Sequence, residues 1–295
     1  MLRSTIAMVV ALLCCASAYA QQTPRGQAGS LREIIPGHYI FNSGDLNSGI
    51  IVTNEGVVVF DALDSEAVAR TQREAIANTI KQPVRFLVSS PYHNPFSKGN
   101  GVYADAWKIG HENYRADLVR QMEQDKASPE EQKARLPDQT FRDRMTLYLG
   151  GKEIQILYLG RAHTRGDSIV YVPQDKIVYL SEVFSAGQFL FMGSGYGVDW
   201  LKTVEAALGL GAEIFVPGHA TLPADPRQSR EEFTRYRQML ADVRDTVAQA
   251  IARGVTEEQA IATIQWPQYE KLRGYEAQRP TAIRRVYRQL TGALQ

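Results

Sequence analysis

Among the residues that could hold a metal or move a proton, three of the five histidines share a setting. His93, His163 and His219 each stand where an apolar, strand-like run gives way to a segment with glycine or proline. Protein scaffolds often place ligands and catalytic groups at such junctions. One such histidine alone would more often be structural, but three in the same setting suggest a shared site. His38, in an early strand-like region, and His111, at a helix start, are interpreted as structural.

The first twenty residues have the pattern of a signal peptide. Arg3 gives a positive start, residues 6–15 form an apolar core too short to span a bilayer, and residues 18–20 form a small-residue cleavage site. We therefore expect cleavage after Ala20, export to a bacterial periplasm or out of the cell, and a disordered leader over residues 21–30. Cleavage removes both cysteines, so a metal site in the mature chain must use histidines and carboxylates.

Charge and hydropathy argue against two classes of partner. The chain has 33 basic and 32 acidic residues, and no basic run is interleaved with aromatic residues, so nucleic-acid binding has no electrostatic support. No apolar stretch after the signal is long enough to cross a membrane. The sequence predicts a soluble, exported protein that binds a small molecule, and it leaves the oligomeric state open.

An α/β order of elements must position the three histidines. Helices are predicted over residues 63–78 and 199–208, the latter capped by Asp199, and around Tyr114, Leu118 and Met122, which share one helical face. Residues 123–139 are charged and contain two prolines, which favours a surface excursion. Strands are predicted at residues 39–41, 49–53, 57–60, 84–88, 107–110, 145–149, 154–159, 168–172, 176–180 and 214–216.

Three helices are predicted after residue 226. The pair Ser229 and Glu232 predicts a capping box for the first, and Thr256 with Gln259 starts the second. The glycine-rich segment 193–197 lacks the spacing of a dinucleotide-binding loop, so we interpret it as a flexible loop near the mouth of the site.

The order of these motifs resembles the metallo-β-lactamase superfamily from about residue 31 to residue 220. That family has a His-x-His-x-Asp-His loop followed by Gly-Asn, an Ala-His-Thr-x-Gly-Asp-like stretch, a bridging aspartate and a final histidine after glycine. Here residues 162–167 read AHTRGD, residues 217–219 read PGH, and Gly99-Asn100 aligns the first motif. The resemblance implies a four-layer αββα sandwich over residues 31–225 and a helical C-terminal extension over residues 226–295.

The alignment also shows what the first motif has lost. Pro91 stands at the first histidine position, His93 keeps the second, Pro95 replaces the aspartate and Phe96 replaces the last histidine. Glu182 takes the place of the bridging aspartate. Because proline and phenylalanine side chains donate no electron pair to a metal, an ordinary dinuclear centre is not expected.

The resemblance then implies at most one metal ion, zinc or else manganese or iron, held by His93, His163, Glu182 and His219. Asp167 would orient the loop that carries His163. If active, the protein would hydrolyse an ester, amide or lactam-type bond of an unknown substrate, with metal-bound water as the nucleophile. The alternative is a catalytically inactive protein, a pseudoenzyme whose pocket binds a ligand or a partner.

Overall fold

The larger of two β-sheets has seven strands that lie in sequence order. The computed structural model describes residues 29–294, so the predicted signal peptide and most of the predicted leader lie outside the described residues. The first four strands pair antiparallel, and the fourth to the seventh pair parallel. The strands are β1 (Ser30–Ile35), β2 (His38–Ser43), β3 (Leu46–Thr53), β4 (Gly56–Phe60), β5 (Val84–Ser89), β6 (Trp107–His111) and β7 (Gln139–Phe141).

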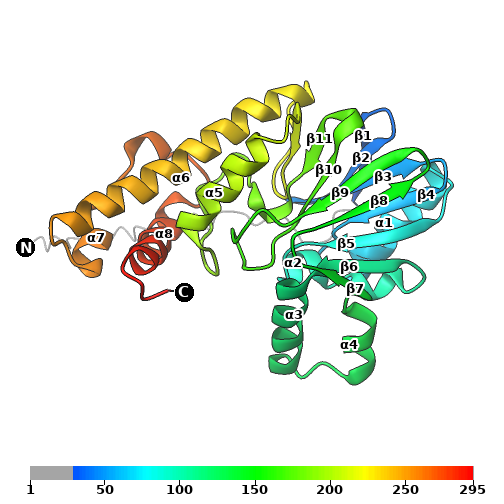
Figure 1. The fold of residues 1–295 in the computed structure, drawn as a ribbon, viewed down its shortest axis with the longest axis horizontal. Helices are drawn as coiled ribbons and strands as arrows, with labels where there is room; N and C mark the ends of the chain where they lie inside the picture. Colours follow the sequence, from blue (N-terminus) through cyan, green and yellow to red (C-terminus); the bar gives the residue numbers. More distant parts are fainter. Residues whose placement is uncertain (1–28, 295) are drawn as a thin grey trace, which may run out of the picture.

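The second sheet has five strands in the order β12-β11-β10-β9-β8. Four of them form an antiparallel meander, and β12 adds parallel to β11. Figure 1 shows this sheet facing the first one. Its strands are β8 (Arg144–Leu149), β9 (Lys152–Leu157), β10 (Ile169–Val172), β11 (Ile177–Tyr179) and β12 (Ile214–Val216).

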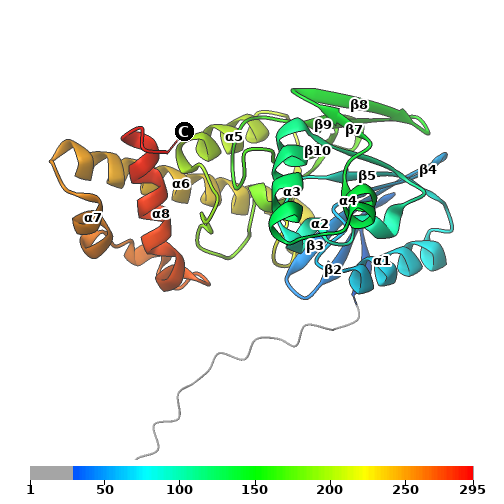
Figure 2. The same ribbon diagram turned by 90° about the horizontal axis from the view of Figure 1, so that it is seen from below.

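Helices cover the outer faces of both sheets, which gives the four-layer αββα sandwich expected from the sequence. The first sheet carries α1, and the second carries α5 and α6, as Figures 1 and 2 show. The helices are α1 (Glu66–Thr79), α2 (Asn94–Ser97), α3 (Glu112–Gln124), α4 (Pro129–Arg135), α5 (Gly197–Leu208), α6 (Ser229–Ala252), α7 (Glu257–Thr263) and α8 (Tyr275–Leu290).

Apolar side chains alternate between the two faces of the central strands. In β4, Val58 and Phe60 point into the core between the sheets, while Val57 and Val59 pack with Ile76 of α1 on the outer face. A strand buried on both faces reads as a continuous apolar run, which is why residues 57–60 were recognisable as a strand. Apolar packing therefore holds β4 on both of its faces.

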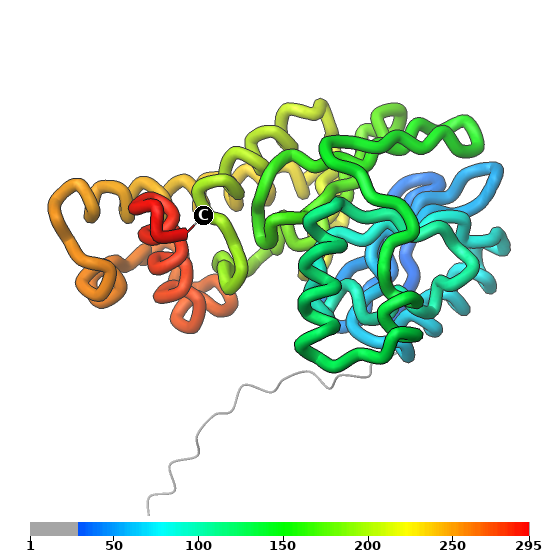
Figure 3. Tube along the Cα trace, turned by 60° about the horizontal axis from the view of Figure 1, so that its bottom comes forward, coloured from blue at the N-terminus to red at the C-terminus, as the bar shows by residue number. Residues whose placement is uncertain are grey.

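Helices α6, α7 and α8 form the predicted helical C-terminal extension. It packs beside α5 and the second sheet, orange and red in Figure 3, and its residues Tyr236, Val247 and Ile283 join the same apolar cluster as Trp200 of α5. Among the described residues, none of the helices combines the length and the apolar character needed to cross a bilayer.

The predicted surface excursion of residues 123–139 is largely exposed and contains α4, capped by Ser128, whose Oγ accepts a hydrogen bond from the Glu131 amide at 3.2 Å. Two helix starts differ from the predictions. The capping box at the start of α6 is absent, because Ser229 Oγ accepts from the Phe215 amide at 2.9 Å instead. Asp199 lies in the first turn of α5 and is ion-paired with Arg161 rather than capping the helix.

The capping box at the start of α7 is confirmed. Thr256 accepts a hydrogen bond from the Gln259 amide at 3.3 Å, and the Gln259 side chain accepts from the Thr256 amide at 3.0 Å. Within residues 29–294, no other group hydrogen-bonds to the Thr256 hydroxyl at this exposed helix start, whereas Ser229 is buried beside β12.

Candidate metal centre

Loops from one edge of the sandwich carry the candidate metal ligands. His93 follows β5 and stands at the start of α2, and His163 lies in the connection from β9 to β10. Glu182 sits in a short 3-10 turn (Ser181–Val183) after β11, and His219 follows β12. Since β9 runs antiparallel to β10, and β10 to β11, the end of β9 lies at the same edge as the ends of β11 and β12.

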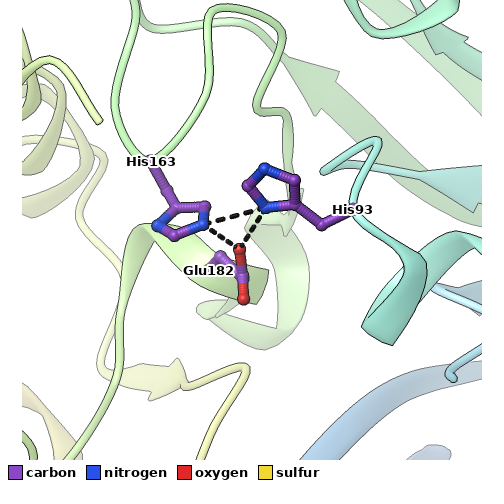
Figure 4. Close-up of side chains that lie close together, drawn as sticks. All are labelled: His93, His163 and Glu182. Atoms are coloured by element: carbon purple, nitrogen blue, oxygen red, sulfur yellow. Dashed lines mark hydrogen bonds and ion pairs between the residues drawn. The ribbon is translucent and has the colours of Figure 1, made fainter. Parts of the chain in front are cut away.

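Three of these side chains converge, as Figure 4 shows. His163 Nε2 lies 2.5 Å from one carboxylate oxygen of Glu182 and 3.0 Å from His93 Nδ1. His93 Nδ1 lies 3.3 Å from the same oxygen. The three donor atoms all lie within 4.8 Å of one another, which makes this group able to hold a metal ion.

The other ring nitrogen of His163 fixes the orientation of the ring. His163 is 2% exposed, and its Nδ1 donates to the Phe191 carbonyl oxygen at 3.0 Å. The Phe191 ring stacks on the imidazole, and Trp200 meets it edge-on. A histidine whose one nitrogen donates to a backbone carbonyl presents the other nitrogen as a ligand, which is the usual arrangement around protein-bound metals.

His219 contacts the opposite oxygen of the carboxylate and lies outside the group of three donors. Its Nε2 is 3.1 Å from Glu182 Oε1, and its Nδ1 is 3.0 Å from Asp45 Oδ2. Asp45 also accepts from Gln188 at 3.3 Å and pairs with Arg273 of the C-terminal extension. Sequence reasoning missed Asp45, because it lies in the turn between β2 and β3, 174 residues from His219.

The buried carboxylate and the imidazoles shift one another's pKa values. Burial would raise the pKa of Glu182, but the charges and hydrogen bonds of His163, His219 and His93 hold it well below its usual range. Burial would lower the pKa of His163, but Glu182 outweighs burial and raises it. For His219, burial is likewise outweighed by Asp45 and Glu182, and its pKa rises to about 9.

Two buried aspartates brace the loops behind these side chains. Asp167 accepts from the Thr164 amide at 2.7 Å and from its hydroxyl at 2.5 Å, which closes the loop that carries His163.

Asp61, missed from the sequence, accepts from the Ser90 amide at 2.9 Å and the Ser181 hydroxyl at 2.5 Å. Burial raises the pKa of Asp61 to about 8. Asp61 thus joins the loop before His93 to the residue before Glu182. Its distance in sequence from these two segments matches no known motif, so the sequence did not reveal it.

The replaced motif positions offer no ligands, and one of them, Phe96, contacts His219. Phe96 is fully buried, and its ring lies edge-on to His219, with ring centres 5.4 Å apart. Pro91 is buried and Pro95 is exposed. The apolar ring of Phe96 therefore occupies the neighbourhood of the family's last histidine and keeps water from that side of His219.

The two remaining histidines contact other parts of the fold. His38 Nε2 lies 2.8 Å from Asp175 at the far end of the sandwich. His111 Nε2 donates to the Arg142 carbonyl oxygen at 2.7 Å, and its ring stacks on Tyr158. Both have the structural setting expected for them.

The three donors fit a single zinc ion. Two ligands on one tetrahedral zinc with bonds of about 2.0–2.1 Å lie about 3.3 Å apart. The separations from His93 Nδ1, 3.0 Å to His163 Nε2 and 3.3 Å to Glu182 Oε2, are close to that value. The separation of 2.5 Å between His163 and Glu182 is a hydrogen-bond distance and would lengthen around an ion. Two imidazoles and one carboxylate are also a donor set that suits zinc.

Gly218 allows the final histidine to approach the glutamate. A Cβ atom at this position would lie 2.4 Å from the backbone carbon and oxygen of Ser181 and 3.0 Å from the Glu182 amide nitrogen. We therefore expect Gly218→Ala to reduce the free energy of unfolding by at least about 2 kcal/mol, because backbone atoms cannot rotate away from the added methyl group.

The matched control is Gly101→Ala, where the nearest atom to the added methyl group is an alanine Cβ at 3.4 Å. Chemical denaturation of both variants measures the difference. Equal stability of the two variants would contradict the close packing of residue 218 on the turn that carries Glu182.

Comparison with known proteins identifies the family. The family model described as the metallo-beta-lactamase superfamily matches residues 44–219, which is more than half of the chain. The chain belongs to the metallo-β-lactamase superfamily. Members of this superfamily usually bind zinc, and the described residues contain one candidate group for a metal, made of His93, His163 and Glu182.

Similarity to individual relatives is low. The chain is 24% identical over 182 residues to the 2,4-dinitroanisole O-demethylase subunit alpha of Nocardioides sp. (strain JS1661), a match covering 60% of this chain and about half, 52%, of that protein. It is also 24% identical over 207 residues to the metallo-beta-lactamase type 2 of Elizabethkingia meningoseptica, covering 67% of this chain and 80% of the enzyme. These identities fit a divergent member of the superfamily.

A solved structure extends the likeness beyond the sandwich. The sec-alkylsulfatase Pisa1 from Pseudomonas sp. superposes with a TM-score of 0.72 at 16% identity, over 90% of this chain and 50% of the sulfatase. Because residues 226–295 make up about a quarter of the chain, a match of that extent includes much of the C-terminal extension. At this identity the likeness concerns the fold alone.

Proposed function

We propose that this protein is a hydrolase that depends on a single metal ion, zinc in the first place, held by His93, His163 and Glu182. The observation that supports this proposal most directly is that the three donor atoms lie within 4.8 Å of one another. The bond cleaved would be of ester, amide or lactam type, and the substrate is a small molecule. Membership of a hydrolase-like superfamily supports this reading over an inactive binding protein.

The proposal divides the chain as the sequence suggested. Residues 31–225 would form the metal-binding sandwich, residues 226–295 an extension of it, and residues 1–20 a cleavable export signal. Contacts across the boundary support treating the extension as part of the working protein, since Arg273 pairs with Asp45 beside His219.

Each side chain at the site has a task that follows from its contacts. A zinc ion, when bound, supplies Lewis-acid activation of water and of a substrate oxygen. His163 and His93 would bind the ion through the nitrogens that face Glu182, and Glu182 would neutralise its charge. His219, held between Asp45 and the second oxygen of Glu182 and with its pKa raised to about 9, would carry a proton at Nε2 that it could donate to a leaving group. Phe96 excludes water on the side of His219.

Zinc affinity should rise with pH, because binding must displace a proton from His163. Its Nδ1 keeps a hydrogen for the Phe191 carbonyl, so the proton lost is the one on Nε2 facing Glu182. Glu182 raises the pKa of His163, so protons compete with zinc for this nitrogen up to a higher pH. Below that raised pKa, we expect affinity to increase about tenfold per pH unit, and above it to level off.

Competition with a chelator at pH 6, 7 and 8 measures this dependence, once the chelator's own titration is taken into account. The same titration on Glu182→Gln should show a shallower slope, because the charge that raises the pKa of His163 is gone. An affinity that does not change over this range in the wild-type protein would contradict displacement of a proton from His163.

Activity is tested with the mature protein on a panel of chromogenic esters, amides and β-lactams. The proposal predicts turnover of at least one class, lost after dialysis against a chelator and restored by zinc. Ligand-induced stabilisation by members of the panel without any turnover, in zinc-loaded protein, would instead support the inactive binding protein.

A further inference from the structure

The glycine-rich loop of residues 193–197 contacts the candidate metal centre directly. Ser194 places its Oγ 3.3 Å from Nε2 of His93 and 3.4 Å from the Tyr92 hydroxyl. Nδ1 of the same ring faces Glu182, so both nitrogens of His93 are engaged. The loop therefore contacts Nε2 of His93, the ring nitrogen that does not face Glu182.

Two side chains of α8 hold this loop in place. Arg285 donates from Nε to the Gly195 carbonyl oxygen and from Nη2 to the Ser194 carbonyl oxygen, each at 2.8 Å. One turn further, Gln289 accepts a hydrogen bond from the Val198 amide at 2.9 Å. The planar guanidinium matches two acceptors at once, which a lysine ammonium cannot do in the same geometry.

Unlike Arg284 and Arg288 on α8, which pair with Glu257, Arg285 has no acidic partner among residues 29–294. It is partly buried, its guanidinium lies 5.5 Å from the centre of the Tyr196 ring, and burial lowers its pKa. Arg288, by contrast, is exposed and pairs with Glu257 at 2.8 Å. A desolvated arginine without a carboxylate is stabilised by the acceptors it does contact, which here are the two loop carbonyls.

We propose that Arg285 is a positioning residue for the metal centre: it fixes the backbone of Ser194 and Gly195 and so keeps the Ser194 hydroxyl on Nε2 of His93. This inference rests on the proposed function. With Nε2–H donating to Ser194, and Ser194 donating on to Tyr92, Nδ1 of His93 carries the free electron pair and faces the metal. Without the hydroxyl, Nε2 loses its acceptor, so the hydrogen stays on Nδ1, where it competes with the metal.

The test measures zinc affinity of the full mature chain by competition with a chromophoric chelator. We expect Arg285→Lys and Ser194→Ala each to weaken zinc binding about tenfold, as is usual for partners of metal-bound histidines. Because both act through one hydrogen bond, the double variant should bind no more weakly than Ser194→Ala alone. Ser194→Thr keeps the hydroxyl and should restore affinity, and Arg288→Lys, on the same helix, should stay within about twofold of wild type.

Unchanged affinity in Arg285→Lys, additive losses in the double variant, or no rescue by threonine would each overturn the inference. If the wild-type protein binds no zinc, the proposed function fails. Nitrogen-15 NMR of the metal-free protein then tests separately whether Arg285 positions the Ser194 hydroxyl at His93. We then expect the Nε2 signal of His93 to move in both Arg285→Lys and Ser194→Ala, because each variant loses the Ser194 contact at this nitrogen. Identical ring-nitrogen signals in all three proteins would overturn it.

Discussion

Replacing Glu182 by glutamine is expected to reduce zinc affinity by at least about a hundredfold, more than any other conservative change in the protein. One oxygen of this carboxylate faces His163 and His93, and the other faces His219. The amide of glutamine has the same size but carries no charge, and one of its two polar atoms can only donate. It can neither neutralise a cation nor accept from imidazoles on both sides.

The same substitution should lower the free energy of unfolding of the metal-free protein by about 1–3 kcal/mol, because the buried imidazole on one side of residue 182 loses its acceptor. Isothermal titration with zinc and chemical denaturation measure the two effects. Glu213→Gln, at an exposed glutamate paired with Lys176, is the control and should change neither. Glu182→Asp keeps the charge but shortens the reach by one methylene, so intermediate affinity is expected. Undiminished zinc binding in Glu182→Gln would remove this residue from the site.

Replacing His163 by alanine is expected to abolish the stabilisation that zinc gives to the wild-type protein. A ligand that binds only the folded state at about a hundred times its Kd stabilises by about 2.7 kcal/mol. In a protein of this size that corresponds to a rise in Tm of about 5 °C. His163 supplies the donor closest to Glu182, so the variant should show almost none of this rise.

His111→Ala is the matched control, because His111 and His163 are each 2% exposed and each donate to a backbone carbonyl. Both variants should be less stable than wild type without metal, since each loses a buried ring. Only His111→Ala should keep the zinc-dependent rise in Tm when the two are compared by calorimetry. A full rise in His163→Ala would show that zinc binds elsewhere.

Much of the fold could be predicted because its strands are apolar on both faces. Residues 57–60 and 84–88 read as strands from composition alone, and the structure places them at the centre of the first sheet. Helix ends were predicted less well where tertiary contacts compete for the capping side chain. Ser229 has the right neighbour for a capping box, yet its hydroxyl is taken by β12, which sequence spacing does not show.

The site was predictable as far as its residues stand in recognisable motifs. His93, His163 and Glu182 were all named from the sequence, and the structure brings their donor atoms together. Asp45 and Arg285 were not, because each acts through contacts with segments far away in the chain. The extension therefore does more than pack beside the second sheet, since Arg273 contacts Asp45 and Arg285 contacts Ser194, and each of these partners contacts a candidate ligand.

The number of metal ions per chain tests the central claim most directly. Elemental analysis of the mature protein, loaded with zinc and freed of excess by gel filtration, should give one zinc per wild-type chain and none per chain of His163→Ala. A wild-type protein without metal, one with two ions per chain, or equal zinc in both proteins would contradict a single site built from His93, His163 and Glu182.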